Sequence, residues 1–216
     1  MLEPERQKTP VFDIYFQDLE LDEKSISDGK RVLDLGAGTA MFAADGRRSN
    51  CWIYSLDADE SAWLPIKNEM LAAKRRGLPS SELDLWREVF SVSTVANMIR
   101  LPFSDGSFEV IVSRYGFPQA IESLAEMEMG LAEVARILAL GGEARFFPFA
   151  TDHWPEATRE MAFKSLEFLV KMKGVWVEIK EKELKQPWGP IEQAYLLTIR
   201  KFEPRDNDRL GIGWAK

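Results

Sequence analysis

Two glycines that directly follow a short apolar run could bring the main chain close to a ligand. The run covers residues 31–35, and Gly36 and Gly38 follow it with Ala37 between them. Because a glycine has no Cβ, a turn built from them lets a bound molecule approach the backbone closely. In an open parallel sheet such a turn lies at the carboxyl ends of the strands, where ligands bind. The pattern predicts a binding turn, although an ordinary strand-to-helix corner also fits these residues.

Two aspartates near the glycines indicate the chemistry of the ligand. Asp57 ends a second apolar run, at a place where a carboxylate can accept both hydroxyls of a ribose, although it could also simply cap the next helix. Asp34 precedes the turn, where a carboxylate suits an ammonium group and disfavours a pyrophosphate. Met41 stands where a dinucleotide-binding turn needs its third glycine. S-adenosylmethionine has an ammonium group, a ribose and no phosphate, so these residues favour it over NAD(P).

Apolar periodicity predicts alternating strands and helices along most of the chain. The last two predicted strands have no helix between them and should therefore pair antiparallel. The strands are predicted over residues 31–35, 51–56, 91–96, 108–113, 143–149, 175–180 and 194–201, and the helices over 39–45, 59–76, 81–90, 121–140 and 155–173.

This alternation predicts an α/β fold with a doubly wound, Rossmann-like sheet of seven strands, mostly parallel with an antiparallel last strand. We expect one domain over residues 1–216, because no repeat, low-complexity tract or linker divides the chain. Within it we distinguish an N-terminal segment (1–30), a cofactor-binding core (31–150) and a C-terminal helix with a strand hairpin (151–216).

The composition narrows the class of protein. There are 28 Lys and Arg against 35 Asp and Glu, a formal net charge of −7, which disfavours nucleic acid as a partner. Cys51 is the single cysteine, so no internal disulfide can form, and with the single histidine, His153, it leaves too few soft ligands for structural zinc. The chain has neither the apolar start of a signal peptide nor an apolar run of about 18 residues. We expect a cytoplasmic protein without a metal and without a membrane partner.

Three stretches, taken in order, resemble motifs of the class I S-adenosylmethionine-dependent methyltransferases. Residues 32–40, Val-Leu-Asp-Leu-Gly-Ala-Gly-Thr-Ala, look like motif I of that superfamily. Residues 95–113 resemble its third and fourth motifs, especially in the methyltransferase type 11 branch. Residues 133–142 resemble the helix and Gly-Gly turn before the fifth strand. The resemblance implies S-adenosylmethionine as cofactor and methyl transfer as activity.

The resemblance also implies how the cofactor would be bound. Gly36 and Gly38 would form the cofactor turn, and Asp34 would help to position that turn or the methionine amino group. Asp57 would hold the ribose, and Ala58 would lie against the adenine.

Asn97 and Met98 are the residues that would bind the adenine edge. Many members of the family carry an Asp where this chain has Asn97, whose amide oxygen can still accept a hydrogen bond without the charge-assisted part. Asn is also a common turn former, so this residue could have only that role. Met98 would offer its backbone N–H to the ring. In motif I, Ala40 replaces a third glycine, which would narrow the pocket slightly. The positions predicted to bind the cofactor are Asp34, Gly36, Ala37, Gly38, Thr39, Asp57, Ala58, Asn97, Met98, Ser113 and Arg114, the last two at its methionine end.

The reaction implied is an in-line displacement at a methyl group that a cationic sulfur already makes electrophilic, so the protein mainly aligns the reactants. A base is needed only if the acceptor must lose a proton. His153 and Tyr115 are the candidates, although its place after a strand favours a loop or cap role for His153, and packing explains Tyr115 equally well.

The acceptor is predicted to be a small molecule. The segment after the fourth predicted strand has no Asn-Pro-Pro-Tyr-like motif, which disfavours adenine-N6 and glutamine-amide acceptors. Four aromatic residues near the predicted pocket favour a planar or apolar acceptor: Tyr115, Phe117, Phe149 and Trp154. Two alternatives remain, a methyltransferase-like scaffold without catalysis and an NAD(P)-dependent oxidoreductase.

Overall fold

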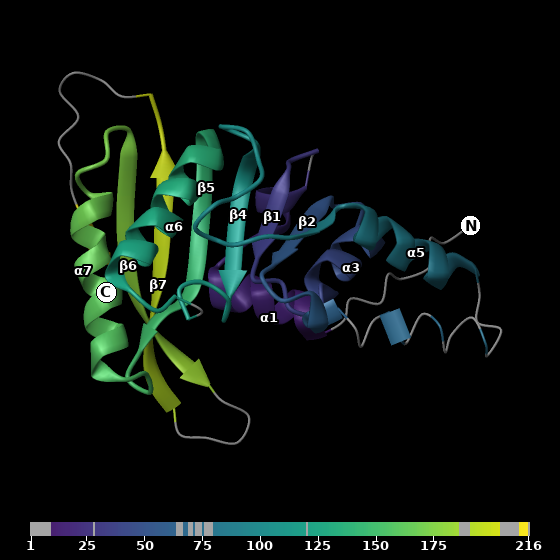
Figure 1. Cartoon of the computed structure of the whole chain (residues 1–216), viewed down its shortest axis with the longest axis horizontal. Coiled ribbons are helices and arrows are strands. Elements are labelled where there is room, and N and C mark those ends of the chain that lie inside the picture. The colour runs from purple at the N-terminus through teal and green to yellow at the C-terminus, as the bar shows by residue number, and fades with distance from the viewer. Residues whose placement is uncertain are drawn as a thin grey trace.

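Eight strands form one sheet in the computed structural model of the chain, in the order β3-β2-β1-β4-β5-β7-β6-β8 (Figure 1). The structure describes residues 10–27, 29–63, 67–68, 71, 75, 80–119, 121–185, 191–203 and 212–215. The strands are β1 (Val32–Leu35), β2 (Ile53–Asp57), β3 (Ser93–Val95), β4 (Phe108–Arg114), β5 (Leu138–Thr151), β6 (Val175–Lys185), β7 (Ile191–Lys201) and β8 (Ile212–Ala215).

The strand directions confirm the predicted fold class. Strands β3, β2, β1, β4 and β5 pair parallel to one another, whereas β7 runs antiparallel to both of its neighbours, β5 and β6. The two strands without a helix between them therefore pair antiparallel, as predicted. An eighth strand, β8, pairs parallel with β6 and was not predicted, because Gly211 and Gly213, of a residue type depleted in strands, interrupt its apolar residues in the sequence.

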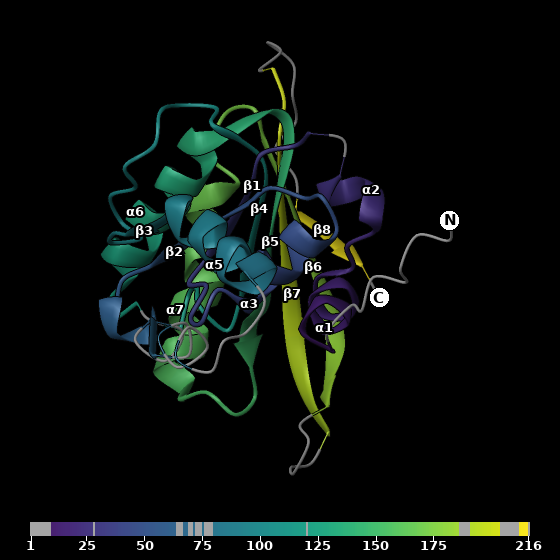
Figure 2. The same ribbon diagram turned by 90° about the vertical axis from the view of Figure 1, so that its right-hand side faces the viewer.

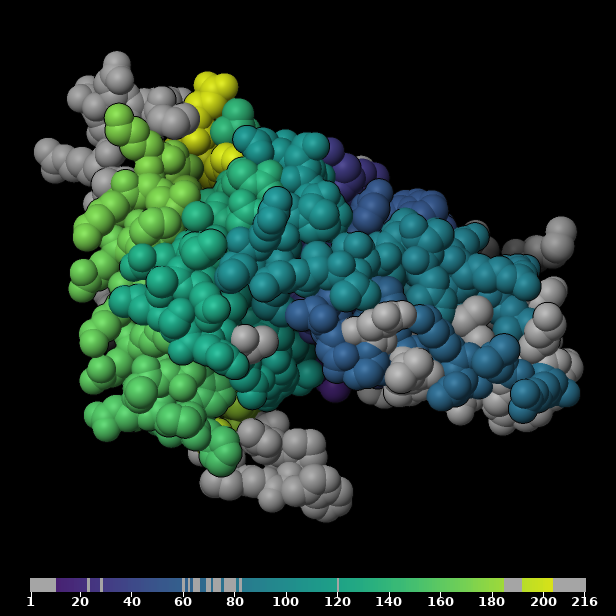
Figure 3. Space-filling model, in the orientation of Figure 1, coloured from purple at the N-terminus to yellow at the C-terminus, as the bar shows by residue number. Residues whose placement is uncertain are grey.

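Helices cover both faces of the sheet, as the doubly wound arrangement requires. Figure 2 shows α6 and α7 on one side of the strands and α1 on the other, and Figure 3 shows the face on which α6 and α7 lie side by side. The helical elements are α1 (Pro10–Leu19), α2 (Glu23–Ile26), α3 (Met41–Arg48), the 3-10 helix η1 (Glu60–Trp63), α5 (Ser80–Ser91), α6 (Leu124–Ile137) and α7 (Glu156–Leu169).

The two faces of the sheet have separate apolar cores. In β1, Leu33 and Leu35 point into the core shared with α6 and α7, while Val32 points into the core shared with α1, α3 and α5. Since side chains alternate along a strand, Asp34 lies on the same face as Val32, toward α1 and α3. The alternation of β1 therefore places a carboxylate inside the second core.

Several predicted boundaries are wrong for identifiable reasons. The helix predicted over residues 121–140 is shorter, because the Ser123 hydroxyl accepts the Glu126 N–H at 3.2 Å and caps α6. At its other end Leu138 is already extended and pairs with Phe108, so the Gly-Gly pair lies inside β5 rather than ending the helix.

Two other predicted helices also differ from the observed ones. The helix predicted over residues 39–45 is α3, which begins only at Met41 because Ala40 is in the left-handed conformation. The helix predicted over 59–76 begins as η1, and most of its remainder lies outside the described residues.

Candidate cofactor site

The turn after β1 is held by backbone hydrogen bonds to the neighbouring strand. The N–H groups of Gly36 and Ala37 both donate to the Leu56 carbonyl oxygen, at 2.8 and 3.0 Å. Gly36 has φ +77° and Gly38 has φ +51°, which are left-handed values that favour glycine. The residue types of this turn are therefore explained by its backbone shape.

Asp57 joins the end of β2 to this turn. Its Oδ2 accepts the Gly38 N–H at 2.8 Å, and its Oδ1 accepts the Asp59 N–H at 3.0 Å. A carboxylate offers about four acceptor positions, so each oxygen retains capacity for another hydrogen bond. A Cβ built on Gly38 would meet nothing within 4 Å, so there is open space beside the same turn. These features fit a ligand that carries a pair of hydroxyl groups.

The loop after β4 is packed directly against the glycine turn. A Cβ on Gly36 would lie 2.6 Å from the Gly116 Cα, and one on Gly116 would lie 2.7 Å from the Gly36 Cα. The buried Ser113 hydroxyl fastens the two segments, because it donates to the Leu35 carbonyl at 2.5 Å and accepts the Phe117 N–H at 2.7 Å. The Ser113 side chain therefore has a structural role in shaping this edge of the sheet.

Asp34 lies beneath the turn and is wholly buried, with 0% of its surface exposed. Its two oxygens accept from the Tyr15 hydroxyl of α1, at 3.4 Å for Oδ1 and 3.2 Å for Oδ2. Burial raises the pKa of Asp34 to about 7, and the nearby Asp57 adds to the rise, while the Tyr15 hydrogen bond and Arg114 oppose it. Asp34 can therefore change its charge near neutral pH.

Arg114, the last residue of β4, is held by α1. Its Nε donates to Asp18 Oδ2 at 2.8 Å, and its guanidinium lies 4.8 Å from the ring centroid of Tyr115 and 6.0 Å from that of Tyr15. Tyr115 has a left-handed backbone with φ +60°, and burial raises the pKa of its hydroxyl. The segment predicted to face the methionine end is thus fixed by the N-terminal helix.

The residues predicted to bind the adenine lie at the carboxyl end of β3. Asn97 is exposed, and its Oδ1 accepts the Ile99 N–H at 3.0 Å, which is the geometry of a turn former. Met98 is buried, and its Cε would lie 3.1 Å from a Cβ on Gly36. Ala58, at the end of β2, and Thr39, in the turn, are both exposed.

His153 lies beyond the end of β5 and is largely in solvent, with 75% of its side chain exposed. Its Nδ1 is 3.7 Å from Oε1 of Glu192, a mostly buried carboxylate on β7 whose Oε2 accepts from the Thr151 hydroxyl at 3.3 Å. The structure thus places an acidic partner beside the predicted base candidate, although the two side chains are too far apart for a hydrogen bond.

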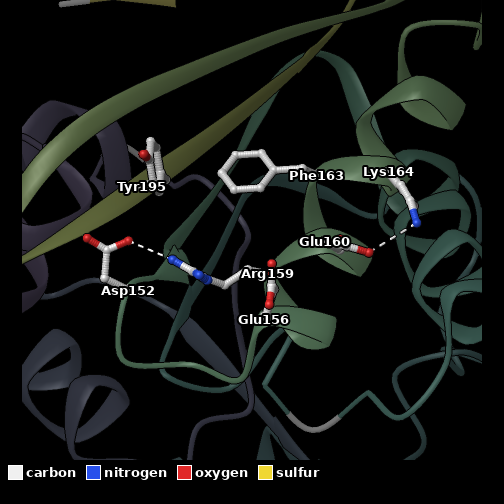
Figure 4. A pocket seen from close by; sticks show the side chains of 7 residues that line it. All are labelled: Asp152, Glu156, Arg159, Glu160, Phe163, Lys164 and Tyr195. Atoms are coloured by element: carbon white, nitrogen blue, oxygen red, sulfur yellow. Dashed lines mark hydrogen bonds and ion pairs between the residues drawn. The ribbon is translucent and has the colours of Figure 1, made fainter.

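A groove of about 420 Å³ lies between the start of α7 and β7, and neither His153 nor Glu192 is among the residues that line it (Figure 4). Phe163 and Tyr195 meet edge to face at 5.1 Å, and Arg159 pairs with Asp152 at 2.8 Å. The residues that line the groove are Asp152, Glu156, Arg159, Glu160, Phe163, Lys164 and Tyr195. Two aromatic side chains thus lie among five charged ones in the lining of this groove.

Two of the aromatic residues predicted to line a substrate pocket lie instead in the apolar core. Phe117 and Phe149 are fully buried among the side chains shared with α6 and α7. Tyr115 and Trp154 are partly exposed. The prediction was wrong for the two phenylalanines because apolar residues next to a strand end can turn inward as easily as outward.

The sequence did not reveal several residues that shape the site. Tyr15 and Asp18 lie in α1, far from the motifs, and their apolar and acidic characters are ordinary for an amphipathic helix. Gly116 carries a signal in hindsight, because a glycine next to a strand end can mark a close approach of two backbones. Within the described residues, no group of three or more His, Cys, Asp or Glu side chains could hold a metal ion.

The strand order, the reversed direction of β7, alone among the described strands, and the glycine turn facing a carboxylate at the end of β2 together define a Rossmann-like protein of the methyltransferase type. The family model described as a methyltransferase domain matches residues 33–146. The chain therefore belongs to this family, within the class I S-adenosylmethionine-dependent methyltransferase superfamily.

Several sequence relatives are demethylmenaquinone methyltransferases. The chain is 31% identical over 146 residues to a demethylmenaquinone methyltransferase from Mycobacterium sp. (strain KMS), covering 68% of this chain and 51% of that protein. It is 27% identical over 193 residues to a ubiquinone/menaquinone biosynthesis C-methyltransferase UbiE from Stenotrophomonas maltophilia, covering 88% and 66%. The match thus spans only about half of the length of several curated relatives.

A solved structure has the same fold. A SAM-dependent methyltransferase from Methanosarcina mazei superposes with a TM-score of 0.54 and 18% sequence identity, covering 90% of this chain and 98% of that one. This likeness supports the architecture described above. Among the described residues, no helix is long and apolar enough to cross a membrane.

Proposed function

We propose that this protein binds S-adenosylmethionine and transfers its methyl group to a small-molecule acceptor. The observation that supports this most directly is the Asp57 carboxylate, which contacts the Gly38 N–H and retains acceptor capacity beside open space. Such a group suits the two hydroxyls of a ribose. When bound, the cofactor supplies a methyl group made electrophilic by a sulfonium.

In this proposal, different residues around the turn bind different parts of the cofactor. Asp57 binds the ribose, the turn from Gly36 to Gly38 presents main chain to the ligand, and the Asp34 side of the turn lies toward the ammonium group. The Asn97 amide and the Met98 backbone lie toward the adenine. Tyr115 and His153, at the ends of β4 and β5, lie on the acceptor side.

A planar, quinone-like ring is the acceptor class we favour. The support is that the relatives are a demethylmenaquinone methyltransferase and a ubiquinone/menaquinone biosynthesis C-methyltransferase, together with the two aromatic side chains, Phe163 and Tyr195, in the groove between α7 and β7. The net charge of −7 argues against a nucleic-acid acceptor. We further propose that residues 1–216 act as one domain in the cytoplasm.

Calorimetry tests the cofactor assignment. The wild-type protein is titrated with S-adenosylhomocysteine and, separately, with NADH. We expect binding of the first and none of the second, because Asp34 disfavours a pyrophosphate and Met41 stands where a dinucleotide-binding turn needs its third glycine. Binding of NADH alone would instead identify an oxidoreductase.

Methyl transfer is then tested with a donor labelled in its methyl group. The acceptors are a demethylated naphthoquinol, a catechol, total RNA and fractionated cell extract. We expect label in the quinol or catechol and none in RNA. Cofactor binding without label in any acceptor or cell-extract fraction would contradict the proposed activity and favour a scaffold.

A further inference from the structure

A buried polar cluster connects α1 with the strands beneath the cofactor turn. Asp34 on β1 and Ser55 on β2 are register partners, so their side chains lie on the same face of the sheet, and both residues are 0% exposed. Ser55 Oγ has no hydrogen-bond partner among the described residues. The one hydrogen-bond donor from another element that reaches the Asp34 carboxylate, within the part of the chain that the structure describes, is the Tyr15 hydroxyl.

Tyr15 is itself packed between the sheet and α3. Its ring stacks on Phe42 of α3, with 4.1 Å between the ring centroids and 12° between the planes. Only 7% of Tyr15 is exposed. Buried polar groups are nearly always fully hydrogen-bonded, so an orphaned hydroxyl and a carboxylate with one long-range donor point to a ligand or water that completes the cluster. The Asp34 carboxylate can accept a further hydrogen bond, and the ammonium group of the proposed cofactor is a suitable donor.

We propose that Tyr15 is a positioning residue, which holds the Asp34 carboxylate in its ionised form and in the orientation that receives the ammonium group of the cofactor. The inference rests on the proposed cofactor binding and adds to it a role for α1. An ionised carboxylate is costly inside an apolar core, and the hydroxyl offsets part of that cost by donating to it. Without Tyr15 the carboxylate would keep its proton to a higher pH.

The charged and titratable groups around Asp34 come from three elements. Tyr15 acts from α1, Asp57 from the end of β2 and Arg114 from the end of β4. Asp57 disfavours the anion, whereas Tyr15 and Arg114 favour it. Arg114 is in turn paired with Asp18 of α1 at 2.8 Å. The helix α1 thus contributes both directly and through Arg114 to the charge of Asp34.

The test compares wild-type protein with Tyr15→Phe, which removes only the hydroxyl. Aspartate labelled with ¹³C at Cγ reports the Asp34 titration in the protein alone, and Asp34→Asn identifies the resonance. In the wild type we expect a midpoint near pH 7, since burial raises the pKa of Asp34 to about 7. In Tyr15→Phe we expect the midpoint to rise by about one pH unit.

Calorimetry with S-adenosylhomocysteine gives the second readout. If only the ionised carboxylate receives the ammonium group, the variant should bind about fivefold more weakly than wild type at pH 7 and less than about twofold more weakly at pH 8.5. A merely structural role would weaken binding equally at both pH values. Tyr54→Phe is the matched control, because it removes a hydroxyl from a partly buried tyrosine that packs against Phe108 instead.

The two proposals fail in different ways. No binding of S-adenosylhomocysteine by the wild type contradicts the proposed function itself. Normal binding by the wild type with an unchanged Asp34 midpoint in Tyr15→Phe, or with the same loss of affinity at both pH values, overturns the role of Tyr15 alone.

Discussion

At the residue scale, the cofactor turn depends on two glycines for different physical reasons. Gly38 needs glycine for its left-handed backbone, whereas Gly116 needs it because the Gly36 backbone leaves no room for a Cβ. The first need follows from a motif in the sequence. The second arises only when two loops, distant along the chain, meet above the sheet, and in the sequence only the position of Gly116 next to a strand end points to it.

Gly116→Ala should therefore destabilise the fold more than Gly38→Ala does. Its Cβ would lie 2.7 Å from the Gly36 Cα and the Leu35 carbonyl oxygen, which are backbone atoms that cannot move aside. We expect a loss of about 2–3 kcal/mol in the free energy of unfolding. Gly38→Ala should cost about 1 kcal/mol, for its left-handed backbone alone. Urea unfolding measures both, and an equal loss in the two variants would contradict the close approach.

Asp34 makes stability depend on pH in a direction unusual for an aspartate. Its pKa rises from the ordinary value of 3.8 to about 7 in the fold because burial disfavours the anion. A raised pKa means that the folded state holds a proton which the unfolded chain has already lost. The contribution is therefore fully present below about pH 4 and is lost as the pH rises to about 7.

Asp34→Asn removes this titration, since the amide stays neutral. Relative to wild type, the variant should gain about 2 kcal/mol in its free energy of unfolding between pH 5 and pH 8. Urea unfolding at the two pH values measures the change. Asp84→Asn, at an exposed position on α5, should show no such gain. A difference between wild type and Asp34→Asn that is the same at both pH values would refute the raised pKa.

At the element scale, the stretch 133–142, which resembles a methyltransferase motif, also holds helix α6 against the loop before β4. We call the two side chains that do so, Glu133 and Arg136, the clamp. Both side chains hydrogen-bond to the segment before β4. Glu133 Oε2 accepts the Leu101 N–H at 2.7 Å. Arg136 donates to the Phe103 carbonyl oxygen at 2.7 Å and to Asp105 Oδ1 at 2.9 Å. The clamp fixes α6 against the loop that leads into β4. Motif residues outside the turn thus position the strand whose end completes the site.

Arg136→Lys tests this clamp. A lysine keeps the charge but cannot donate in several fixed directions at once, as the guanidinium does here. We expect a loss of about 2 kcal/mol in the free energy of unfolding. Arg87→Lys changes an arginine that pairs only with the exposed Asp84 within the described residues, and it should cost less than about 0.5 kcal/mol. Equal effects of the two substitutions would show that the clamp contributes nothing.

Sequence patterns predicted the number and directions of most strands but not the ends of the helices. Seven strands and the antiparallel closing pair follow from apolar runs and from the missing helix between the last two. The ends of α6 do not follow, because Ser123 and Leu138 set them through a cap and a strand pairing that apolar periodicity does not record. The contribution of α1 could not be predicted either, because Tyr15 meets Asp34 only after the helix packs on the sheet.

At the scale of the whole molecule, the two faces of the sheet have different roles. The face covered by α6 and α7 has a large apolar core. The face covered by α1 and α3 contains the buried polar cluster of Tyr15, Asp34 and Ser55, and the Asp57 carboxylate lies at its edge. The α6/α7 face thus contributes apolar packing to the fold. The α1/α3 face carries the two carboxylates, Asp34 and Asp57, that the proposed function places beside the cofactor.

The measurement that tests this function most directly is the calorimetric titration of S-adenosylhomocysteine into wild type, Asp57→Asn and Asp59→Asn at pH 8. Asp57→Asn removes the negative charge from the side chain that would accept hydrogen bonds from the ribose. Asp59→Asn is the control, because it changes an exposed neighbour and keeps the Asp59 backbone N–H, which donates to Asp57. We predict binding by wild type and Asp59→Asn, and binding that is weaker by about ten- to a hundredfold in Asp57→Asn. Absence of binding by the wild type, or equal affinity in all three proteins, would contradict the proposed function.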